Sequence, residues 1–168
     1  CAESVFFCNS GAEAIESAIK LIKKYGNNKD KYKESLILAA ESSFHGRTIG
    51  ALSATGQPKY QQGFEPLLRG FRFFKYNNID SIRKIFNESI QNKQIISGII
   101  IEPIQGEGGV IPGEKEFFRE LRELCNKNDT LLILDEVQSG VGRTGKMWGY
   151  ENLDIEPDGF TLAKGLGG

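Results

Sequence analysis

The chain alternates short apolar runs with longer segments of helical pattern along its whole length. The apolar runs occupy residues 4–8, 36–40, 71–75, 95–102, 131–134 and 159–163. Between the first two runs, apolar residues recur at the three- and four-residue spacing of an amphipathic helix. Such alternation is typical of a mainly parallel sheet whose two faces are covered by helices. The sequence therefore predicts an α/β fold with the layers of an α/β/α sandwich.

Three helices have the clearest pattern. Their apolar positions are Ile15, Ala18, Ile19 and Ile22 in the first, Ile79, Ile82 and Phe86 in the second, and Phe117, Leu121, Leu124 and Cys125 in the third. The first helix is expected to end near Gly26, because glycine favours helix C-termini, and the polar run 27–35 is expected to form a loop. Parallel sheets bind ligands beyond the carboxyl ends of their strands, so residues that follow strands are the candidates for a site.

Composition and charge narrow the class of protein. With 168 residues, a net charge of -1 and a pI near 6.0, the chain has enough length for one core and no basic excess to attract nucleic acid or an anionic membrane. No apolar stretch reaches the roughly 18 residues of a membrane span. Cys1, Cys8 and Cys125 are widely spaced and accompany a single histidine. This pattern disfavours a metal site and favours reduced thiols in a cytoplasmic protein.

Both ends of the chain look cut. The sequence opens on Cys1 and enters an apolar run almost at once, and it stops inside the glycine run that follows Lys164. We therefore expect residues 1–168 to be part of a longer protein.

Lys164 and Asp135 are the first candidate pair. Asp135 ends the apolar run 131–134, and Lys164 stands between the run 160–163 and the glycine-rich residues 165–168. Alone, the lysine reads as solvated surface and the aspartate as a loop cap or a metal ligand. Together at strand ends they suit pyridoxal 5′-phosphate, because the amine forms a Schiff base with its aldehyde and the carboxylate keeps its pyridine nitrogen protonated.

Residues 9–13, Asn-Ser-Gly-Ala-Glu, join the first apolar run to the first helix. Ser10 and Glu13 have the spacing of a capping box, and a capped helix with nothing bound is the plainer interpretation. The start of a helix also offers free N–H groups and the positive end of a dipole. Gly11 and Ala12 are small enough to let a phosphate approach that helix start closely.

Residues 44–48, Phe-His-Gly-Arg-Thr, follow the second apolar run. Phe44 before a glycine is usually core packing, and Arg47 alone reads as a surface charge. Beside a pyridine ring, however, Phe44 can stack on the ring and Arg47 can bind a substrate carboxylate in a bidentate pair. His45 would pack beside the ring or cap a turn, and we do not expect it to be the catalytic base.

Residues 102–109, Glu-Pro-Ile-Gln-Gly-Glu-Gly-Gly, follow the fourth apolar run. Glu102 and Glu107 could suggest the acid and base of a glycosidase. No other feature supports sugar chemistry. The flanking glycines and Pro103 indicate a constrained loop in which one carboxylate supports a site and the other faces a substrate.

Residues 131–146 also resemble the nucleotide-binding motifs of a nucleotide hydrolase. The run 131–136 could pass for a Walker B strand, and residues 140–146 contain the spacing GxxxxGK. Met147 stands where a P-loop needs Ser or Thr to bind magnesium, and no strand comes immediately before these glycines. The sequence therefore disfavours this alternative.

Taken in order, five segments make essentially the whole chain resemble the class III, ornithine-type, pyridoxal phosphate aminotransferases. They are FFCNSGAEA (6–14), FHGRT (44–48), EPIQGEGG (102–109), LLILDEVQSGVGRTG (131–145) and LAKGLGG (162–168). The resemblance implies most of the large domain of a fold-type I transferase. It also implies that the family's N-terminal segment and C-terminal small domain, with an arginine for the α-carboxylate of glutamate, lie outside residues 1–168.

The same resemblance implies a role for each candidate residue. Cofactor contacts would fall to Ser10, Gly11, Ala12, Phe44, His45, Asp135, Val137, Gln138 and Lys164. Lys164 would hold the cofactor and carry protons, and Asp135 would pair with the pyridine nitrogen. Val137 would pack on the ring face opposite Phe44, and Gln138 would contact the phenolic oxygen. The remaining three candidates are Arg47 and Glu107, which would face the substrates, and Glu102, which would support the site from behind.

The implied reaction moves the δ-amino group of N2-acetylornithine to 2-oxoglutarate, as in arginine biosynthesis. It would take place in a homodimer with its active sites at the subunit interface. Family members that act on 4-aminobutyrate, ornithine or succinyl-diaminopimelate share most of these motifs, so these donors remain alternatives. A related aminomutase is disfavoured because Gln138 stands where that branch has methionine. The alternative from another class is a non-catalytic fragment that binds no cofactor.

Overall fold

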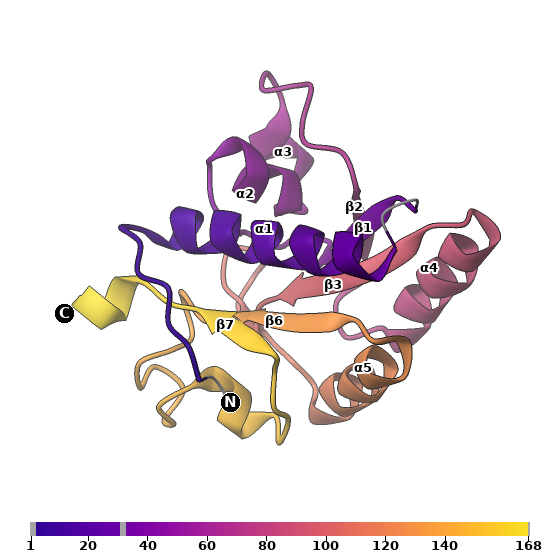
Figure 1. Cartoon of the computed structure of the whole chain (residues 1–168). Helices are drawn as coiled ribbons and strands as arrows, with labels where there is room; N and C mark the ends of the chain where they lie inside the picture. The colour runs from indigo at the N-terminus through magenta and orange to yellow at the C-terminus, as the bar shows by residue number, and fades with distance from the viewer. Residues whose placement is uncertain (1–2, 31–32, 168) are drawn as a thin grey trace.

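A five-stranded parallel sheet forms the centre of the computed structural model, which describes residues 3–30 and 33–167 (Figure 1). The strands are β1 (Ser35–Ala40), β2 (Phe71–Phe74), β3 (Ile95–Ile101), β6 (Leu131–Asp135) and β7 (Gly159–Thr161). Their order across the sheet is β2-β1-β3-β6-β7, and every neighbouring pair runs parallel. Five of the six predicted strands are therefore confirmed, with ends that differ by one or two residues.

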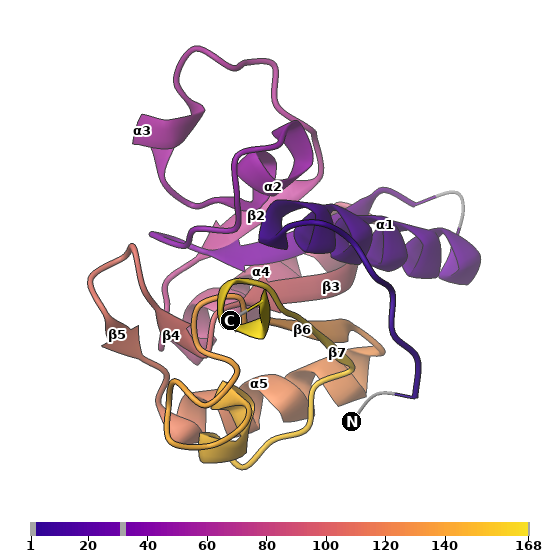
Figure 2. The ribbon, with the colours of Figure 1, turned by 90° about the vertical axis from the view of Figure 1, so that its left-hand side faces the viewer.

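Helices cover both faces of this sheet, as predicted. The helix α1 (Gly11–Lys29) lies along one face with α2 (Ile49–Ala54) packed against it, and α4 (Ile79–Gln91) and α5 (Lys115–Asn128) cover the other face (Figures 1 and 2). The remaining elements are the helix α3 (Pro58–Gln61), the antiparallel pair β4 (Ile104–Gln105) and β5 (Ile111–Pro112), and the 3-10 helices η1 (Gly149–Asn152) and η2 (Lys164–Gly167). The α/β/α sandwich is confirmed.

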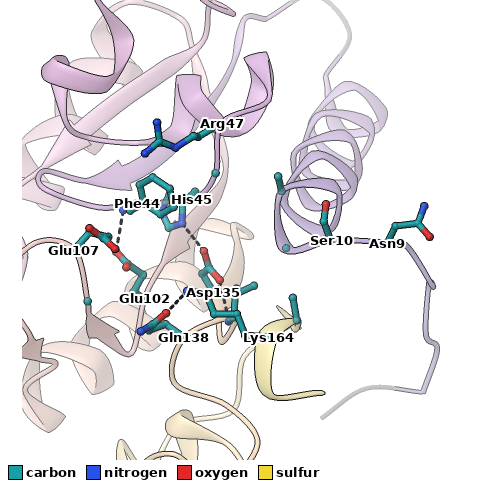
Figure 3. Close-up of a pocket in the computed structure, with 16 residues that line it drawn as sticks. Asn9, Ser10, Phe44, His45, Arg47, Glu102, Glu107, Asp135, Gln138 and Lys164 are labelled. Carbon is teal, nitrogen blue, oxygen red and sulfur yellow. Dashed lines mark hydrogen bonds and ion pairs between the residues drawn. The ribbon is translucent and has the colours of Figure 1, made fainter. Parts of the chain in front are cut away.

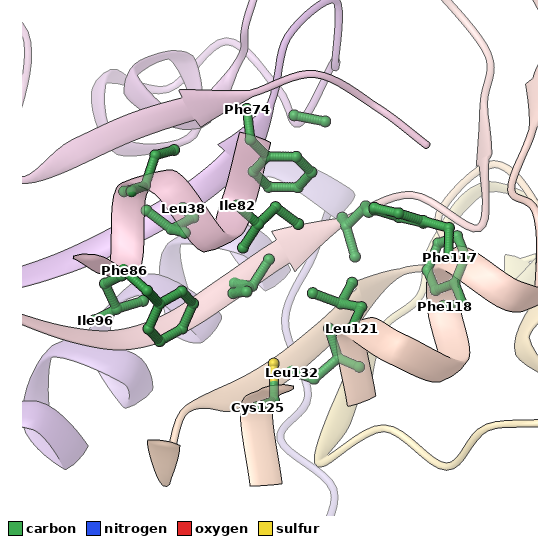
Figure 4. Packing of buried hydrophobic residues seen from close by; sticks show 14 of the residues in the cluster. Leu38, Phe74, Ile82, Phe86, Ile96, Phe117, Phe118, Leu121, Cys125 and Leu132 are labelled. Atoms are coloured by element: carbon green, nitrogen blue, oxygen red, sulfur yellow. The ribbon is translucent and has the colours of Figure 1, made fainter. Parts of the chain in front are cut away.

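The two faces of the sheet bury separate apolar clusters, because successive side chains of a strand point to opposite sides. In β1, Leu36, Leu38 and Ala40 pack with α4 and α5 in the larger cluster (Figure 4). Ile37 between them packs with the apolar positions of α1 instead. Both clusters are fully enclosed, so the strands read as continuous apolar runs in the sequence.

Gly26 is not at the end of α1, so the predicted boundary is wrong. The helix continues to Lys29, and Asp30 is its C-cap. A Cβ atom at Gly26 would lie 2.0 Å from Ser97 Oγ and 2.6 Å from Ser35 Oγ. Gly26 is therefore the point where α1 approaches the sheet most tightly. The predicted loop 27–35 is shorter than expected, since it begins after Lys29 and Ser35 already belongs to β1.

The strand predicted at residues 4–8 is also wrong. This segment pairs with no strand among the described residues, and Val5, Phe6 and Phe7 are 76%, 75% and 89% exposed. An apolar run becomes a strand only where a neighbour completes its hydrogen bonds.

The carboxyl ends of β1, β3, β6 and β7 meet at one edge of the sheet, and the N-terminus of α1 reaches the same edge (Figures 1 and 2). The chain passes from β1 to β2 on one side and then returns to β3 on the other. This reversal creates a switch point between β1 and β3, where parallel sheets bind their ligands. The fold thus gathers the predicted motifs at one place.

Within residues 3–30 and 33–167, no helix is both long enough and apolar enough to cross a membrane. The same residues contain no cluster of three or more His, Cys, Asp or Glu side chains suited to a metal ion. Cys8 is exposed and Cys125 is buried, and both are free thiols. Cys1 lies outside the described residues.

Candidate active site

A pocket of about 480 Å³ opens at the carboxyl edge of the sheet (Figure 3). It lies between the start of α1 and the loops that follow β1, β3, β6 and β7. All the residues predicted for the site line it, namely Ser10, Gly11, Ala12, Phe44, His45, Arg47, Glu102, Glu107, Asp135, Val137, Gln138 and Lys164. The sequence did not assign roles to Asn9, Gly46, Gly106 and Ala163, which complete the lining.

Three hydrogen-bonding partners hold the side chain of Asp135. It is 4% exposed at the end of β6, and its Oδ2 lies 2.7 Å from His45 Nδ1. Its Oδ1 accepts hydrogen bonds of 3.1 Å from the Val137 N–H and the Thr161 hydroxyl. Contacts from three directions fix the carboxylate, so it can face a cationic partner without moving.

The imidazole of His45 contacts Asp135 rather than capping a turn. The side chain of His45 is fully buried, and the backbone N–H of His45 donates to Thr55 Oγ1 at 2.9 Å. Burial lowers the pKa of His45, but the hydrogen bond and the charge of Asp135 outweigh burial and raise this pKa above its usual value. The other ring nitrogen, Nε2, is buried and has no hydrogen-bond partner among the described residues. These contacts make His45 a support for the orientation of Asp135.

Glu102 lies behind this pair at the end of β3. It is 5% exposed, and its Oε2 accepts a 3.4 Å hydrogen bond from the Phe44 N–H. Burial raises the pKa of Glu102 to about 7, because water no longer stabilises the charged form. The charge of His45 and the backbone N–H groups of Phe44 and Gly106 oppose the rise, whereas the charge of Asp135 adds to it. Glu102 therefore titrates near neutral pH inside the structure.

The start of α1 has only half of the predicted capping box, because the Glu13 carboxylate binds the N–H of Asn9 and not that of the N-cap residue Ser10. Ser10 Oγ accepts from the Glu13 N–H at 3.2 Å, and the Glu13 carboxylate accepts from the Asn9 N–H at 2.6 Å. The first-turn N–H groups of Gly11 and Ala12 have no carbonyl partner within the helix. Both residues line the pocket, so these donors are available to an anion there.

Two glycines allow the start of α1 to sit close to the neighbouring loops. A Cβ atom at Gly11 would lie 2.9 Å from Val137 Cγ1. A Cβ atom at Gly46, whose φ of 134° is a glycine conformation, would lie 2.9 Å from the Cβ of Ala12. Larger residues at either position would push the helix start away from the pocket.

Lys164 reaches the pocket from the first residue of η2, three residues after β7. Its amine donates a hydrogen bond to the side-chain oxygen of Gln138. Its φ of 44° is left-handed, a backbone conformation that costs a non-glycine residue about 1–3 kcal/mol and is common at functional sites. The lysine is thus placed by a strained turn beyond the strand rather than by the strand itself.

Arg47 and Phe44 lie together on the side of the pocket away from Lys164 (Figure 3). The guanidinium carbon of Arg47 is 5.9 Å from the centre of the Phe44 ring and 5.1 Å from that of Tyr60. Phe44 and Tyr60 also meet edge to face. Arg47 is exposed and forms no ion pair with a carboxylate among the described residues, which leaves its fork of donors open to a ligand.

Glu136 was not predicted to have a role and turns out to hold the loop after β6. It is 1% exposed, and its carboxylate accepts from the Ser139 hydroxyl and from the N–H groups of Gly149 and Tyr150 at 2.6–2.9 Å. These bonds tie the turn that carries Val137 to the start of η1. Residues 140–146 form turns with no α-helix after them, which contradicts the P-loop alternative.

Three further residues that support the site could not be predicted from the sequence, because their roles depend on tertiary contacts. Thr161 meets Asp135 only through the register of β6 and β7, in which the two residues are partners. Thr55 lies ten residues from the backbone of His45 that it supports. Tyr76 reaches the carbonyl oxygen of Glu102 from the turn that follows β2. No spacing within the sequence signals any of these contacts.

The residues of the pocket fit pyridoxal 5′-phosphate. The amine of Lys164 suits its aldehyde, the buried carboxylate of Asp135 suits a pyridinium nitrogen, and the open N–H groups of Gly11 and Ala12 suit a phosphate. Phe44 and Val137 line the same pocket and supply apolar surface for a flat ring.

Comparisons with known proteins agree with this chemistry. The family described as Aminotransferase class-III matches residues 1–168. The acetylornithine aminotransferase of Prochlorococcus marinus subsp. pastoris is 79% identical over the whole chain, which covers 40% of that protein. The acetylornithine aminotransferase of Synechocystis sp. is 54% identical, with 100% of this chain and 39% of that protein covered.

Solved structures give the same result. The ornithine aminotransferase of Toxoplasma gondii ME49 has a TM-score of 0.86 at 30% identity, over 95% of this chain and 37% of that one. A transaminase from the marine bacterium Virgibacillus has a TM-score of 0.86 at 34% identity, over 94% of this chain and 37% of that one. The chain spans about 40% of the length of the curated relatives it matches. It belongs to the class-III aminotransferase family.

Proposed function

We propose that this chain is part of the large domain of a longer enzyme that transfers the δ-amino group of N2-acetylornithine to 2-oxoglutarate with pyridoxal 5′-phosphate. The observation that carries the proposal is that one pocket contains the Lys164 amine, the Asp135 carboxylate and the open start of α1. Relatives that are 50–79% identical and named acetylornithine aminotransferase support the choice of donor.

The cofactor, when bound, would supply an electron-accepting ring that stabilises negative charge on the substrate carbon. The residues that would hold it are Lys164 at the aldehyde, Asp135 at the pyridine nitrogen, Gln138 at the phenolic oxygen, Phe44 and Val137 on the two faces, and Ser10, Gly11 and Ala12 at the phosphate. His45 would act through Asp135, whose Oδ2 it contacts at 2.7 Å.

Lys164 would move the protons of the reaction. Its amine would take a proton from the amine-bearing carbon of the donor and return a proton to the acceptor carbon in the second half of the cycle. Gln138 would orient this amine, since its side-chain oxygen already accepts a hydrogen bond from Lys164. The carboxylate of Asp135 would stay in place throughout, because His45, Thr161 and the Val137 N–H hold both of its oxygens.

Arg47 and Glu107 would recognise the substrates. The guanidinium of Arg47 has donors available for a carboxylate, which both N2-acetylornithine and 2-oxoglutarate carry. Glu107 is exposed and lines the same pocket, so its charge would face a substrate and help the site to alternate between donor and acceptor. Glu102, which is a buried residue of the pocket lining, would support the carboxylate of Asp135 and the imidazole of His45.

The complete enzyme would be a cytoplasmic homodimer whose partner subunit and further domains finish the pocket. The support is an exposed apolar surface beside the site. Val5, Phe6 and Phe7 lead into the pocket residues 9–12, and Leu166 follows Lys164 and is 60% exposed. Surfaces of this kind normally mark interfaces.

The test is an assay of the full-length enzyme for glutamate formed from 2-oxoglutarate. N2-acetylornithine, ornithine, 4-aminobutyrate and succinyl-diaminopimelate would be compared as donors. We expect the highest kcat/KM with N2-acetylornithine, by about tenfold or more, which corresponds to a modest difference in transition-state binding. A higher kcat/KM for another donor would overturn the substrate assignment, and no transfer from any donor would overturn the reaction.

A further inference from the structure

The loop that carries Glu107 is held by a turn that lies outside the pocket. We call residues 102–114, which contain β4 and β5, the hairpin segment, and residues 75–78, between β2 and α4, the anchor turn. The hairpin segment begins at Glu102 and brings Glu107 to the pocket. The two strands pair through only Ile104 with Pro112 and Gln105 with Ile111. A ribbon this short is not stable by itself, so other contacts must fix it.

Tyr76 of the anchor turn holds the first end of the hairpin segment. Its hydroxyl lies 2.8 Å from the carbonyl oxygen of Glu102 and 3.0 Å from that of Pro103, so one O–H donor serves two acceptors. Its ring packs near Phe117 and Phe118 of α5. Burial, together with the nearby charge of Glu102, raises the pKa of Tyr76 well above its usual value, so its hydroxyl stays a donor.

Asn77 holds the other end. Its side-chain N–H donates to the carbonyl oxygen of Pro112 at 3.0 Å, and its side-chain oxygen accepts from the Glu114 N–H at 3.0 Å. Its φ of 55° is left-handed, a conformation that asparagine tolerates better than most residues. The Gly113 N–H donates to the carbonyl oxygen of Pro103 at 2.9 Å and joins the two ends of the hairpin segment. Neighbouring residues of one turn therefore secure both sides of the base of the hairpin.

We propose that Tyr76 and Asn77 are positioning residues that set the place of Glu107 and so influence how the pocket discriminates between amino donor and acceptor. Neither residue lines the pocket, so each acts through the backbone of the hairpin segment. The link to donor and acceptor rests on the proposed function. The anchoring itself rests on the hydrogen bonds alone.

The anchoring can be measured by hydrogen exchange in the full-length protein. Asn77→Gly removes the side-chain amide and still permits a positive φ. The control is Asn78→Ala, because Asn78 caps α4 through the Ser81 N–H at 2.9 Å and has no hydrogen bond to the hairpin segment in the described structure. We expect the backbone amides of residues 104–111 and 113 to exchange about fivefold or more faster in Asn77→Gly, which loses both side-chain hydrogen bonds to this segment, and to be unchanged in Asn78→Ala. Tyr76→Phe should act as Asn77→Gly does.

Steady-state kinetics test the consequence for the reaction. We expect Asn77→Gly and Tyr76→Phe to change the ratio of KM for 2-oxoglutarate to KM for N2-acetylornithine by about fivefold, with a smaller change in kcat, because positioning affects the two substrates unequally. Asn78→Ala should leave the ratio unchanged. Unchanged exchange in Asn77→Gly would overturn the anchoring. Faster exchange with an unchanged KM ratio would overturn the effect on discrimination. A wild-type protein without transamination would contradict the proposed function and leave the exchange result to decide the anchoring.

Discussion

Asp135 reaches its position because β6 and β7 pair in a register that places it opposite Thr161. His45, from the loop after β1, then contacts its second oxygen at 2.7 Å. Each partner comes from a different element, and each is itself held, His45 by Thr55 and Thr161 by its place in β7. The result is a charge that needs little reorganisation when a cation binds, which is the basis of electrostatic stabilisation in enzymes.

Replacement of Asp135 tests this role. Asp135→Asn keeps the shape of the side chain and loses its charge, so we expect kcat of the full-length enzyme to fall about a hundredfold or more, roughly 3 kcal/mol in activation free energy. Asp154→Asn is the matched control, because Asp154 binds Lys115 and does not line the pocket. An Asp135→Asn enzyme with the kcat of the parent would rule out a pyridinium partner at this position.

Glu102 makes stability depend on pH. Its pKa rises from 4.5 to about 7 on folding, so the folded state binds the proton more tightly than the unfolded state. Protonated Glu102 therefore contributes to the free energy of unfolding. This contribution is complete below pH about 4.5 and is lost as pH rises through about 7, and the free energy of unfolding falls by roughly 3 kcal/mol in total. Denaturant unfolding between pH 5 and 8 should show this loss in the parent and a smaller one in Glu102→Gln, which cannot titrate. If the free energy of unfolding depended on pH in the same way in both proteins, the raised pKa of Glu102 would be contradicted.

Among individual residues, the sequence predicted most of those that line the pocket and few of those that hold them in place. Lys164, Asp135 and Phe44 lie in short motifs that follow apolar runs, and the fold brings such segments to one edge. Thr161 and Tyr76 have no motif, because their contacts arise from strand register and from a turn across the sheet. The roles of the lining residues remain predictions that the variants must test.

Among the elements, α1 shows both what periodicity can predict and what it cannot. The spacing of Ile15, Ile19 and Ile22 correctly gave its buried face, and the capping residue Ser10 gave its start. Its end was misplaced because Gly26 has a tertiary reason to be glycine. The strand expected at 4–8 failed for a related reason, since an apolar run does not reveal whether a partner strand is present.

For Gly26→Ala, the packing of α1 predicts a change in stability opposite to the one that helix propensity predicts. Propensity alone favours Gly26→Ala by about 1 kcal/mol. The new methyl group would lie 2.0 Å from Ser97 Oγ and 2.7 Å from Ser97 Cβ, so we expect a net loss of about 1–3 kcal/mol in the free energy of unfolding. Asn28→Ala, on the exposed side of the same helix, should cost nothing. The double variant Gly26→Ala with Ser97→Gly should recover much of the loss, and a stabilising Gly26→Ala would show that α1 does not pack this closely.

For the whole molecule, the order of strands explains why distant motifs meet. The reversal between β1 and β3 separates their loops, and the pocket forms where the loops diverge. The alternation of strands and helices made the fold class predictable from sequence, whereas the order of the strands was not predicted. How the exposed residues Val5, Phe6 and Phe7 are covered was not predictable, because that depends on protein outside these 168 residues in our proposal.

The 168-residue chain expressed alone should not catalyse efficient transamination. In our proposal the arginine that binds the α-carboxylate of glutamate and the partner subunit lie outside it, so substrate orientation is lost as well as affinity. Its exposed apolar surface also favours aggregation. A coupled glutamate assay on the purified chain, beside the full-length enzyme, measures the difference. Comparable kcat/KM values would show that residues 1–168 suffice.

The most direct test of the whole account is to find which lysine binds the cofactor. The full-length protein would be saturated with pyridoxal 5′-phosphate, reduced with borohydride to make the bond permanent, digested and analysed by mass spectrometry. We expect the added mass on the peptide that contains Lys164 and no stable label in Lys164→Ala, while Lys146→Ala, a change outside the pocket, should label like the parent. A label on another lysine, or none in the parent, would contradict the assignment of this pocket as the cofactor site.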